Sequence, residues 1–150
     1  MPDTPKNAKD VRDIAAEGPG ARDKKILVVD DEESILALFE EIGGYHGCEV
    51  FVASNADEAL DVLRGKDINV IFLDLKLFGM NGIELCKRIR RHKPLAVIYA
   101  ITGWAGLYEV AECREAGFDD FFRKPLSNDL VARLIDDAFE KVRRWTRQRV

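Results

Sequence analysis

The sequence predicts an α/β fold in which a doubly wound parallel sheet lies between two layers of helices. Short apolar runs, typical of buried strands, alternate with segments in which apolar residues recur every three or four positions, as on one face of a helix. Five such strand and helix pairs follow one another in strict alternation. We therefore expect five strands and five flanking helices in three layers.

The expected strands are short apolar segments. They are residues 25–30, 48–53, 68–75, 95–102 and 119–124. The third, INVIFLDL, is apolar almost throughout, as expected of a central parallel strand that is covered on both faces. The second, CEVFVA, shows the alternation that is typical of a strand.

The expected helices follow the strands. They are residues 34–47, 55–67, 81–93, 107–117 and 127–145. In the first helix, the residues predicted to face the core are Ile35, Leu38, Phe39 and Ile42. Asn55 and Asn81 are expected N-caps, because each has a glutamate three positions later.

The composition predicts one soluble domain in residues 25–146. The 150 residues are enough for a sizeable core, and the mean hydropathy is -0.19. No apolar stretch approaches the roughly 20 residues that span a bilayer, and the N-terminus lacks the apolar centre of a signal peptide. We expect a cytoplasmic protein with a mobile extension at 1–24 that contains a short helix near VRDIAAE, and with a basic end at 147–150.

The charge is unevenly distributed and the cysteines are few. Residues 26–140 contain 12 basic and 22 acidic residues, whereas the last ten carry five basic residues and no acidic one. The acidic body argues against a nucleic-acid surface. Three widely spaced cysteines without a C-x-x-C motif favour buried apolar side chains over disulfides or a zinc site. These are Cys48, Cys86 and Cys113.

Polar residues stand where the expected strands end, and in a doubly wound sheet this edge binds the ligand. They are Asp30, Asp31, Asp74, Thr102 and Lys124. A single aspartate after a strand is often only the N-cap of the next helix. Three clustered carboxylates would repel one another without a cation, however, and their hard oxygens suit Mg²⁺. The combination therefore predicts a site for a metal and a phosphate.

Other phosphate-binding motifs are missing from the sequence. There is no G-x-G-x-x-G after the first strand and no G-x-x-x-x-G-K-[ST]. Neither His46 nor His92 follows an expected strand, so the usual general base is lacking. The residues at the ends of the expected strands therefore suit a carboxylate nucleophile, a metal site and a site that binds phosphate.

Four motifs together resemble the receiver domain of two-component response regulators, a flavodoxin-like (CheY-like) family. They are VVDDEES, IFLDLKLFGMNGIEL, AIT followed by Gly103, and DDFFRKP, in the expected order at expected strand ends. The resemblance covers the chain from about residue 25 to the last expected helix. It implies the strand order 2-1-3-4-5.

The resemblance implies an acceptor and a metal site. Asp74 would be the phosphoacceptor for a phosphohistidine on a sensor histidine kinase or a histidine phosphotransfer protein. Asp30, Asp31 and Asp74 would bind Mg²⁺, together with the backbone carbonyl of Lys76.

It also implies a phosphate site and a switch. Thr102, the Gly103 N–H and Lys124 would bind phosphoryl oxygens. Thr102 and Phe121 would couple the site to a changed protein-binding face, and the peptide before Pro125 would be cis.

The sequence departs from the family pattern in one loop. Phe78 stands where a proline is common, which bears on the shape of that loop. Trp104 follows Thr102 closely, and packing on the next helix, shielding of the phosphoryl group and contact with a partner are all open.

We therefore expect a stand-alone receiver that is not an enzyme beyond its own phosphorylation and slow dephosphorylation. It would signal to an unidentified protein, or form a phosphorylation-dependent homodimer, without contacting nucleic acid or membrane. Two alternatives stay open: a Mg²⁺-dependent phosphohydrolase with an aspartyl-phosphate intermediate, and the receiver of a longer regulator with an output domain. The first is disfavoured because DDEES has no Asp-x-Asp spacing.

Overall fold

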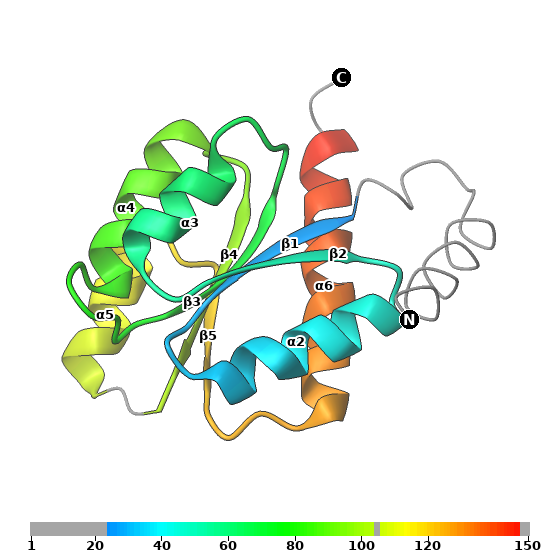
Figure 1. The fold of residues 1–150 in the computed structure, drawn as a ribbon. Helices are drawn as coiled ribbons and strands as arrows, with labels where there is room; N and C mark the ends of the chain where they lie inside the picture. Colours follow the sequence, from blue (N-terminus) through cyan, green and yellow to red (C-terminus); the bar gives the residue numbers. More distant parts are fainter. Residues whose placement is uncertain (1–23, 104–105, 148–150) are drawn as a thin grey trace.

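The computed structural model describes residues 24–103 and 106–147, which form a five-stranded sheet between two layers of helices (Figure 1). The strands are β1 (Lys25–Val29), β2 (Glu49–Ala53), β3 (Val70–Asp74), β4 (Val97–Thr102) and β5 (Asp120–Arg123). All neighbouring pairs are parallel, in the order β2-β1-β3-β4-β5. The predicted fold class and strand order are confirmed.

The strand order places a ligand site between β1 and β3. From β1 the chain moves to β2 on one side, then returns to β3 on the other side of β1. Connections on either side of this point leave in opposite directions, which opens a crevice at the carboxyl ends of these two strands. Asp30 and Asp74 lie at these ends.

The helices cover the two faces of the sheet unequally. They are α2 (Glu33–Tyr45), α3 (Ala56–Leu63), α4 (Gly82–His92), α5 (Leu107–Ala116) and α6 (Asn128–Arg147). Helices α2 and α6 cover one face, and α3, α4 and α5 cover the other (Figure 1). The second helix is shorter than predicted, because Arg64 is extended and Gly65 has a φ of 72°.

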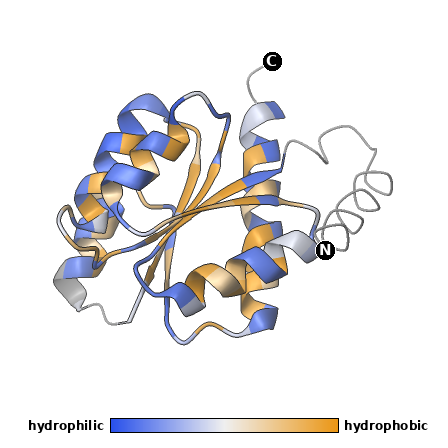
Figure 2. Ribbon diagram, viewed as in Figure 1, coloured by the Kyte–Doolittle hydropathy of each residue, from blue (hydrophilic) through white to orange (hydrophobic). Residues whose placement is uncertain are grey.

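Each face of the sheet has its own hydrophobic core, and the apolar stripes of the helices point toward the strands (Figure 2). All five residues of β3 are buried, which confirms the central strand. On the α2 and α6 face the rings of Phe39, Phe72, Tyr99 and Phe122 form a continuous series of contacts with centroids 4.7 to 5.6 Å apart. Ile35 and Phe39 are buried as predicted, whereas Leu38 is only half-buried.

The expected caps and buried thiols are confirmed. The side chains of Asn55 and Asn81 each accept a hydrogen bond of 2.9 Å from the N–H three residues later. Cys48, Cys86 and Cys113 are buried and free. Burial raises the pKa of Cys48 to about 11 and that of Cys86 to about 12, so these thiols stay protonated.

Within residues 24–103 and 106–147, no helix is long and apolar enough to cross a membrane. Residues 1–23 of the predicted N-terminal extension, Trp104, and residues 148–150 of the predicted basic end lie outside the described residues.

Candidate functional site

Three polar side chains are buried at the carboxyl ends of the central strands. Asp30 is 0 % exposed, Asp74 4 % and Thr102 0 %, and among the described residues no other charged residue is buried. Asp74 is paired with Ile101 in the β3–β4 register, so Thr102 follows directly beside it on the next strand. Buried charges occur only where they are neutralised or where a ligand uses them. This cluster is therefore the candidate site.

Lys124 is the cation that faces the acidic cluster. Its Nζ lies 2.8 Å from Asp30 Oδ2, 2.5 Å from Glu32 Oε1 and 3.4 Å from Asp74 Oδ2. Its backbone N–H donates to the Thr102 carbonyl at 2.8 Å, and its peptide bond to Pro125 is cis. Burial lowers the pKa of Lys124, but the bonds to Asp30 and Glu32 outweigh burial and the pKa is raised.

The surroundings of Asp74 make ionisation of its carboxyl group unfavourable. Burial raises the pKa of this carboxyl to about 6, and the nearby Asp30 carboxylate adds to the effect. The Lys76 N–H, which donates to Asp74 Oδ1 at 3.2 Å, and the Lys124 ammonium oppose it. The single ammonium therefore does not fully compensate the carboxylates around it.

The acidic cluster fits a divalent cation. Asp30, Asp31 and Asp74 each offer a carboxylate oxygen, and these three oxygens lie within 4.8 Å of one another. Asp30 Oδ1 accepts the Glu32 N–H at 2.9 Å, whereas the buried Asp30 Oδ2 accepts no well-formed hydrogen bond within the described part of the chain. It lies close to Lys124 Nζ, so that contact is an ion pair of poor hydrogen-bond angle. Three carboxylate oxygens so close together are the hard ligands that suit Mg²⁺.

The backbone after β3 approaches helix α4 closely, and only glycine fits at Gly82. A Cβ atom at Gly82 would lie 2.2 Å from the Asp74 carbonyl oxygen and 2.8 Å from Leu75 Cα. The Gly82 N–H also donates to the Leu75 carbonyl at 2.9 Å. The start of α4 thus presses against the backbone that carries Asp74.

The loop between Asp74 and α4 points outward. Phe78 is 89 % exposed, and Gly79 has a φ of 86°, a conformation that favours glycine. Lys76 and Gly103 are also exposed. Phe121 is half-buried against the core under α3, α4 and α5, and pairs with Ala100 in β4.

The structure brings together Asp30, Asp31, Asp74 and Lys124, as the sequence predicted. Sequence reasoning missed two residues. Glu32 binds Lys124, and the run of acids after β1 was the available signal. For Gly82, the sequence offered only one local signal of its close packing, namely a glycine directly after the N-cap Asn81.

Comparisons with known proteins agree on one family. The family model described as "Response regulator receiver domain" matches residues 26–136. The chain is 33% identical over 108 residues to the sporulation initiation phosphotransferase F of Bacillus subtilis, which covers 72% of this chain and 87% of that protein. It is 38% identical over 104 residues to the alkaline phosphatase synthesis transcriptional regulatory protein PhoP of Bacillus subtilis, which covers 69% of this chain and only 43% of PhoP.

Solved structures give the same result. A CheY-like response regulator receiver domain protein from Methanospirillum hungatei matches with a TM-score of 0.74 and 30% identity, over 81% of this chain and 98% of that one. NtrX from Brucella abortus, solved in complex with ADP, matches with a TM-score of 0.76 and 29% identity, over 82% of this chain and 28% of NtrX.

Proposed function

We propose that Asp74 accepts a phosphoryl group from a phosphohistidine, because the chain belongs to the receiver domain family of two-component response regulators. The donor would be a sensor histidine kinase or a histidine phosphotransfer protein. One observation carries the proposal: Asp74 is a buried carboxylate beside two other aspartates and 3.4 Å from an ammonium. This arrangement supports phosphoryl transfer, which depends mainly on positioning and charge neutralisation.

The Asp74 carboxylate has the chemistry of a nucleophile. Its Oδ1 is held by the Lys76 N–H, and its Oδ2 faces Lys124. Attack of a carboxylate oxygen on phosphorus forms the acyl phosphate as the bond from phosphorus to the imidazole nitrogen breaks, and the nitrogen keeps that electron pair. Lys124 would then stabilise the negative phosphoryl oxygens.

Asp30, Asp31 and Asp74, with the Lys76 carbonyl, would hold Mg²⁺. The burial of Asp30 Oδ2, whose contact with Lys124 is an ion pair, and the proximity of the three carboxylates support this assignment. When bound, the ion would neutralise the charge that otherwise opposes the approach of a phosphate. Asp30 is kept in place by the Glu32 N–H.

Thr102 and the Gly103 N–H would bind the remaining phosphoryl oxygens. Thr102 lies at the end of β4 beside Asp74, and its carbonyl accepts the Lys124 N–H. Movement of this strand end would therefore reach β5, where Phe121 is half-buried. We propose that Phe121 couples phosphorylation to the face of α5, β5 and α6, which would bind a partner protein or a second copy.

The proposed reaction is limited to the domain itself. The protein would accept a phosphoryl group and lose it slowly to water, with no external substrate. No described histidine lies beside the acidic cluster at the carboxyl ends of the strands. His46 instead contacts Asp136, and His92 is the last residue of α4.

Mg²⁺-dependent labelling with acetyl phosphate tests this function. We expect the wild-type chain to incorporate phosphate only when Mg²⁺ is present, and Asp74→Asn to incorporate none above background. The matched control is Asp57→Asn, an exposed aspartate in the first turn of α3, which should label as the wild type does. Full labelling of Asp74→Asn would refute the assignment of the acceptor.

A further inference from the structure

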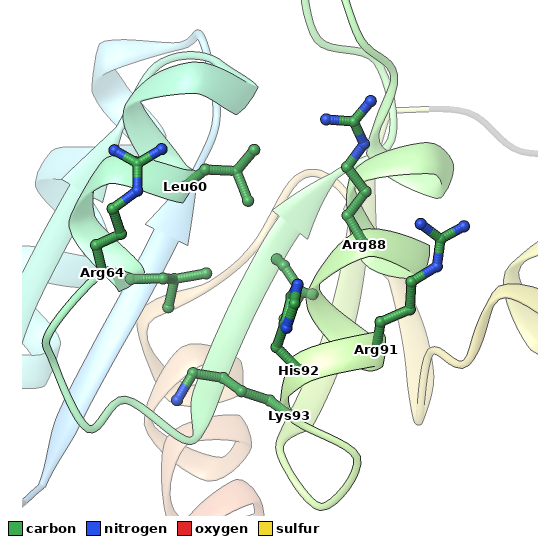
Figure 3. A pocket seen from close by; sticks show the side chains of 8 residues that line it. Leu60, Arg64, Arg88, Arg91, His92 and Lys93 are labelled. Atoms are coloured by element: carbon green, nitrogen blue, oxygen red, sulfur yellow. The ribbon is translucent and has the colours of Figure 1, made fainter.

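A second cavity lies far from the acidic cluster, between the carboxyl-terminal parts of α3 and α4 (Figure 3). We call it the α3–α4 groove. It has a volume of about 570 Å³ and is lined by Leu60, Leu63, Arg64, Arg88, Ile89, Arg91, His92 and Lys93. Both helices end here, at the edge of the sheet where β3 and β4 begin. The groove is therefore at the opposite end of the sheet from Asp74.

The groove has an aliphatic floor and a cationic rim. Ile89 is buried, and Leu60 and Leu63 are half-buried. The other lining residues are all basic, and the lining contains no carboxylate, amide or hydroxyl side chain. Figure 3 shows the Lys93 side chain extending from α4 toward α3, with the His92 ring between the two helices.

Most of these cations have no acidic partner. Arg88, Arg91 and Lys93 form no ion pair in the described parts of the chain. Arg64 is paired with Asp61, one turn earlier on its own helix, but both side chains are more than two-thirds exposed. Such an exposed pair is weak and leaves the guanidinium available to a ligand.

Stabilisation of the helix end does not explain the rim. Basic residues often bind the free carbonyls at the end of a helix. In α4 such a contact is made by Arg90, which does not line the groove; it donates to the carbonyl of Lys93, the C-cap of α4, and to the carbonyls of Ala96 and Gly117. Within the described residues, Arg88 and Arg91 make no such contact, and they stand out as basic residues in a segment, 26–140, that is acidic overall.

We propose that the α3–α4 groove binds a small amphiphilic anion, which has an aliphatic body and a phosphate or carboxylate group. The volume is that of a small-molecule site, and the lining is confined to one or two turns of each helix, which is less surface than a stable protein interface needs. The aliphatic floor would cover the apolar body, and guanidinium groups would bind the anion in bidentate fashion. A nucleobase is disfavoured, because the floor would leave its polar edges without hydrogen bonds.

An NMR titration tests the site with three probes: hexyl phosphate, inorganic phosphate and hexanol. It uses the full chain carrying Asp74→Asn without Mg²⁺, so its outcome does not depend on phosphorylation. We expect hexyl phosphate to shift the methyl signals of Leu60, Leu63 and Ile89 saturably. It should bind at least about tenfold more tightly than inorganic phosphate, since burial of two methylenes alone corresponds to about tenfold. It should also bind at least about tenfold more tightly than hexanol, which has the same chain but lacks the anion that accepts charged hydrogen bonds. Hexanoate in place of hexyl phosphate distinguishes a carboxylate from a phosphate ligand.

The double variant Arg88→Gln, Arg91→Gln identifies the cations that matter. It should weaken hexyl phosphate binding by about tenfold or more, since each charged hydrogen bond is worth about 1.5 kcal/mol or more. The matched control is Arg133→Gln, an exposed arginine on α6 at the other face of the sheet, which should leave binding unchanged. Equal affinity for hexyl phosphate and inorganic phosphate, no saturable shift of the floor methyls, or unchanged binding by the double variant would each overturn the proposal. Tighter binding of an amphipathic Leu/Glu peptide than of hexyl phosphate would do so too, in favour of a protein segment.

Discussion

The two ends of the sheet carry opposite charge in opposite surroundings. At the carboxyl ends of the strands, Asp30, Asp74 and Lys124 are mostly buried and lie within contact of one another. At the other end, Arg88 and Arg91 are exposed and unpaired within the described chain, while Arg90 alone is tied to the backbone. The Asp74 charge is coupled to its neighbours and opposes folding, whereas the charges of Arg88 and Arg91 are independent of the fold. Substitutions should therefore have large effects at the first end and small ones at the second, with Arg90 as the exception.

Gly82→Ala should have the largest effect on stability. The added Cβ would lie 2.2 Å from the Asp74 carbonyl, and backbone atoms on both sides cannot move away easily. We expect the free energy of unfolding to fall by about 3 kcal/mol or more in urea denaturation. Gly103→Ala is the matched control, since no described atom beyond its chain neighbours lies within 4 Å of the added Cβ. Equal stability of the two variants would show that α4 does not press on the Asp74 backbone.

Arg90→Gln should be next, and it tests the exception at the basic end. It removes the guanidinium that donates to the Lys93, Ala96 and Gly117 carbonyls and contacts Asp119. Loss of these bonds should lower the free energy of unfolding by about 2 kcal/mol. Arg91→Gln, the adjacent and exposed control, should stay within about 0.5 kcal/mol of the wild type. A similar loss in both variants would contradict the distinction drawn between these arginines.

Asp74→Asn should raise stability by a smaller amount when metal is removed by a chelator. The pKa of Asp74 is raised from 3.8 to about 6, so between these values the folded state binds more protons than the unfolded state. Stability therefore falls as the pH rises through this window, and the full penalty is present above pH 6. We expect a gain on the order of 1 to 2 kcal/mol at pH 7 from removal of this charge.

The pH dependence separates this cause from others. Below pH 3.8 the carboxyl is protonated in both states, so the variant should lose its advantage there. Urea denaturation of both proteins across this range measures the difference. A gain that is the same at pH 3 and pH 7 would mean that relief of charge is not its origin.

The fold followed from local patterns that the sequence contains in full. Apolar runs such as VIFLD and the caps at Asn55 and Asn81 fix strands and helix starts without knowledge of distant contacts. The predicted end of α3 at residue 67 was wrong, because the helix ends where Arg64 and Gly65 leave the helical conformation. Asp30, Asp31, Asp74 and Lys124 were predictable because parallel strands bring their carboxyl ends to one edge.

The remaining features depend on contacts between distant segments. Lys124 and Glu32 are in contact although they are 92 positions apart in the sequence. The close approach of Gly82 to the Asp74 backbone depends on how α4 packs against the sheet. The α3–α4 groove joins residues of two helices whose basic residues look, in sequence, like ordinary solvated helix ends. Only the structure shows that Arg90, unlike Arg88 and Arg91, binds backbone carbonyls in the described part of the chain.

Borohydride reduction followed by peptide mass spectrometry tests the central claim most directly. The chain would be treated with acetyl phosphate and Mg²⁺, and borohydride would then reduce any acyl phosphate to the alcohol, which converts the aspartate into homoserine. We predict homoserine at position 74 and none at positions 30 or 31, although the oxygens of all three aspartates lie within 4.8 Å of one another. Homoserine at Asp30 or Asp31, or at none of the three positions in protein that carries the label, would contradict the account.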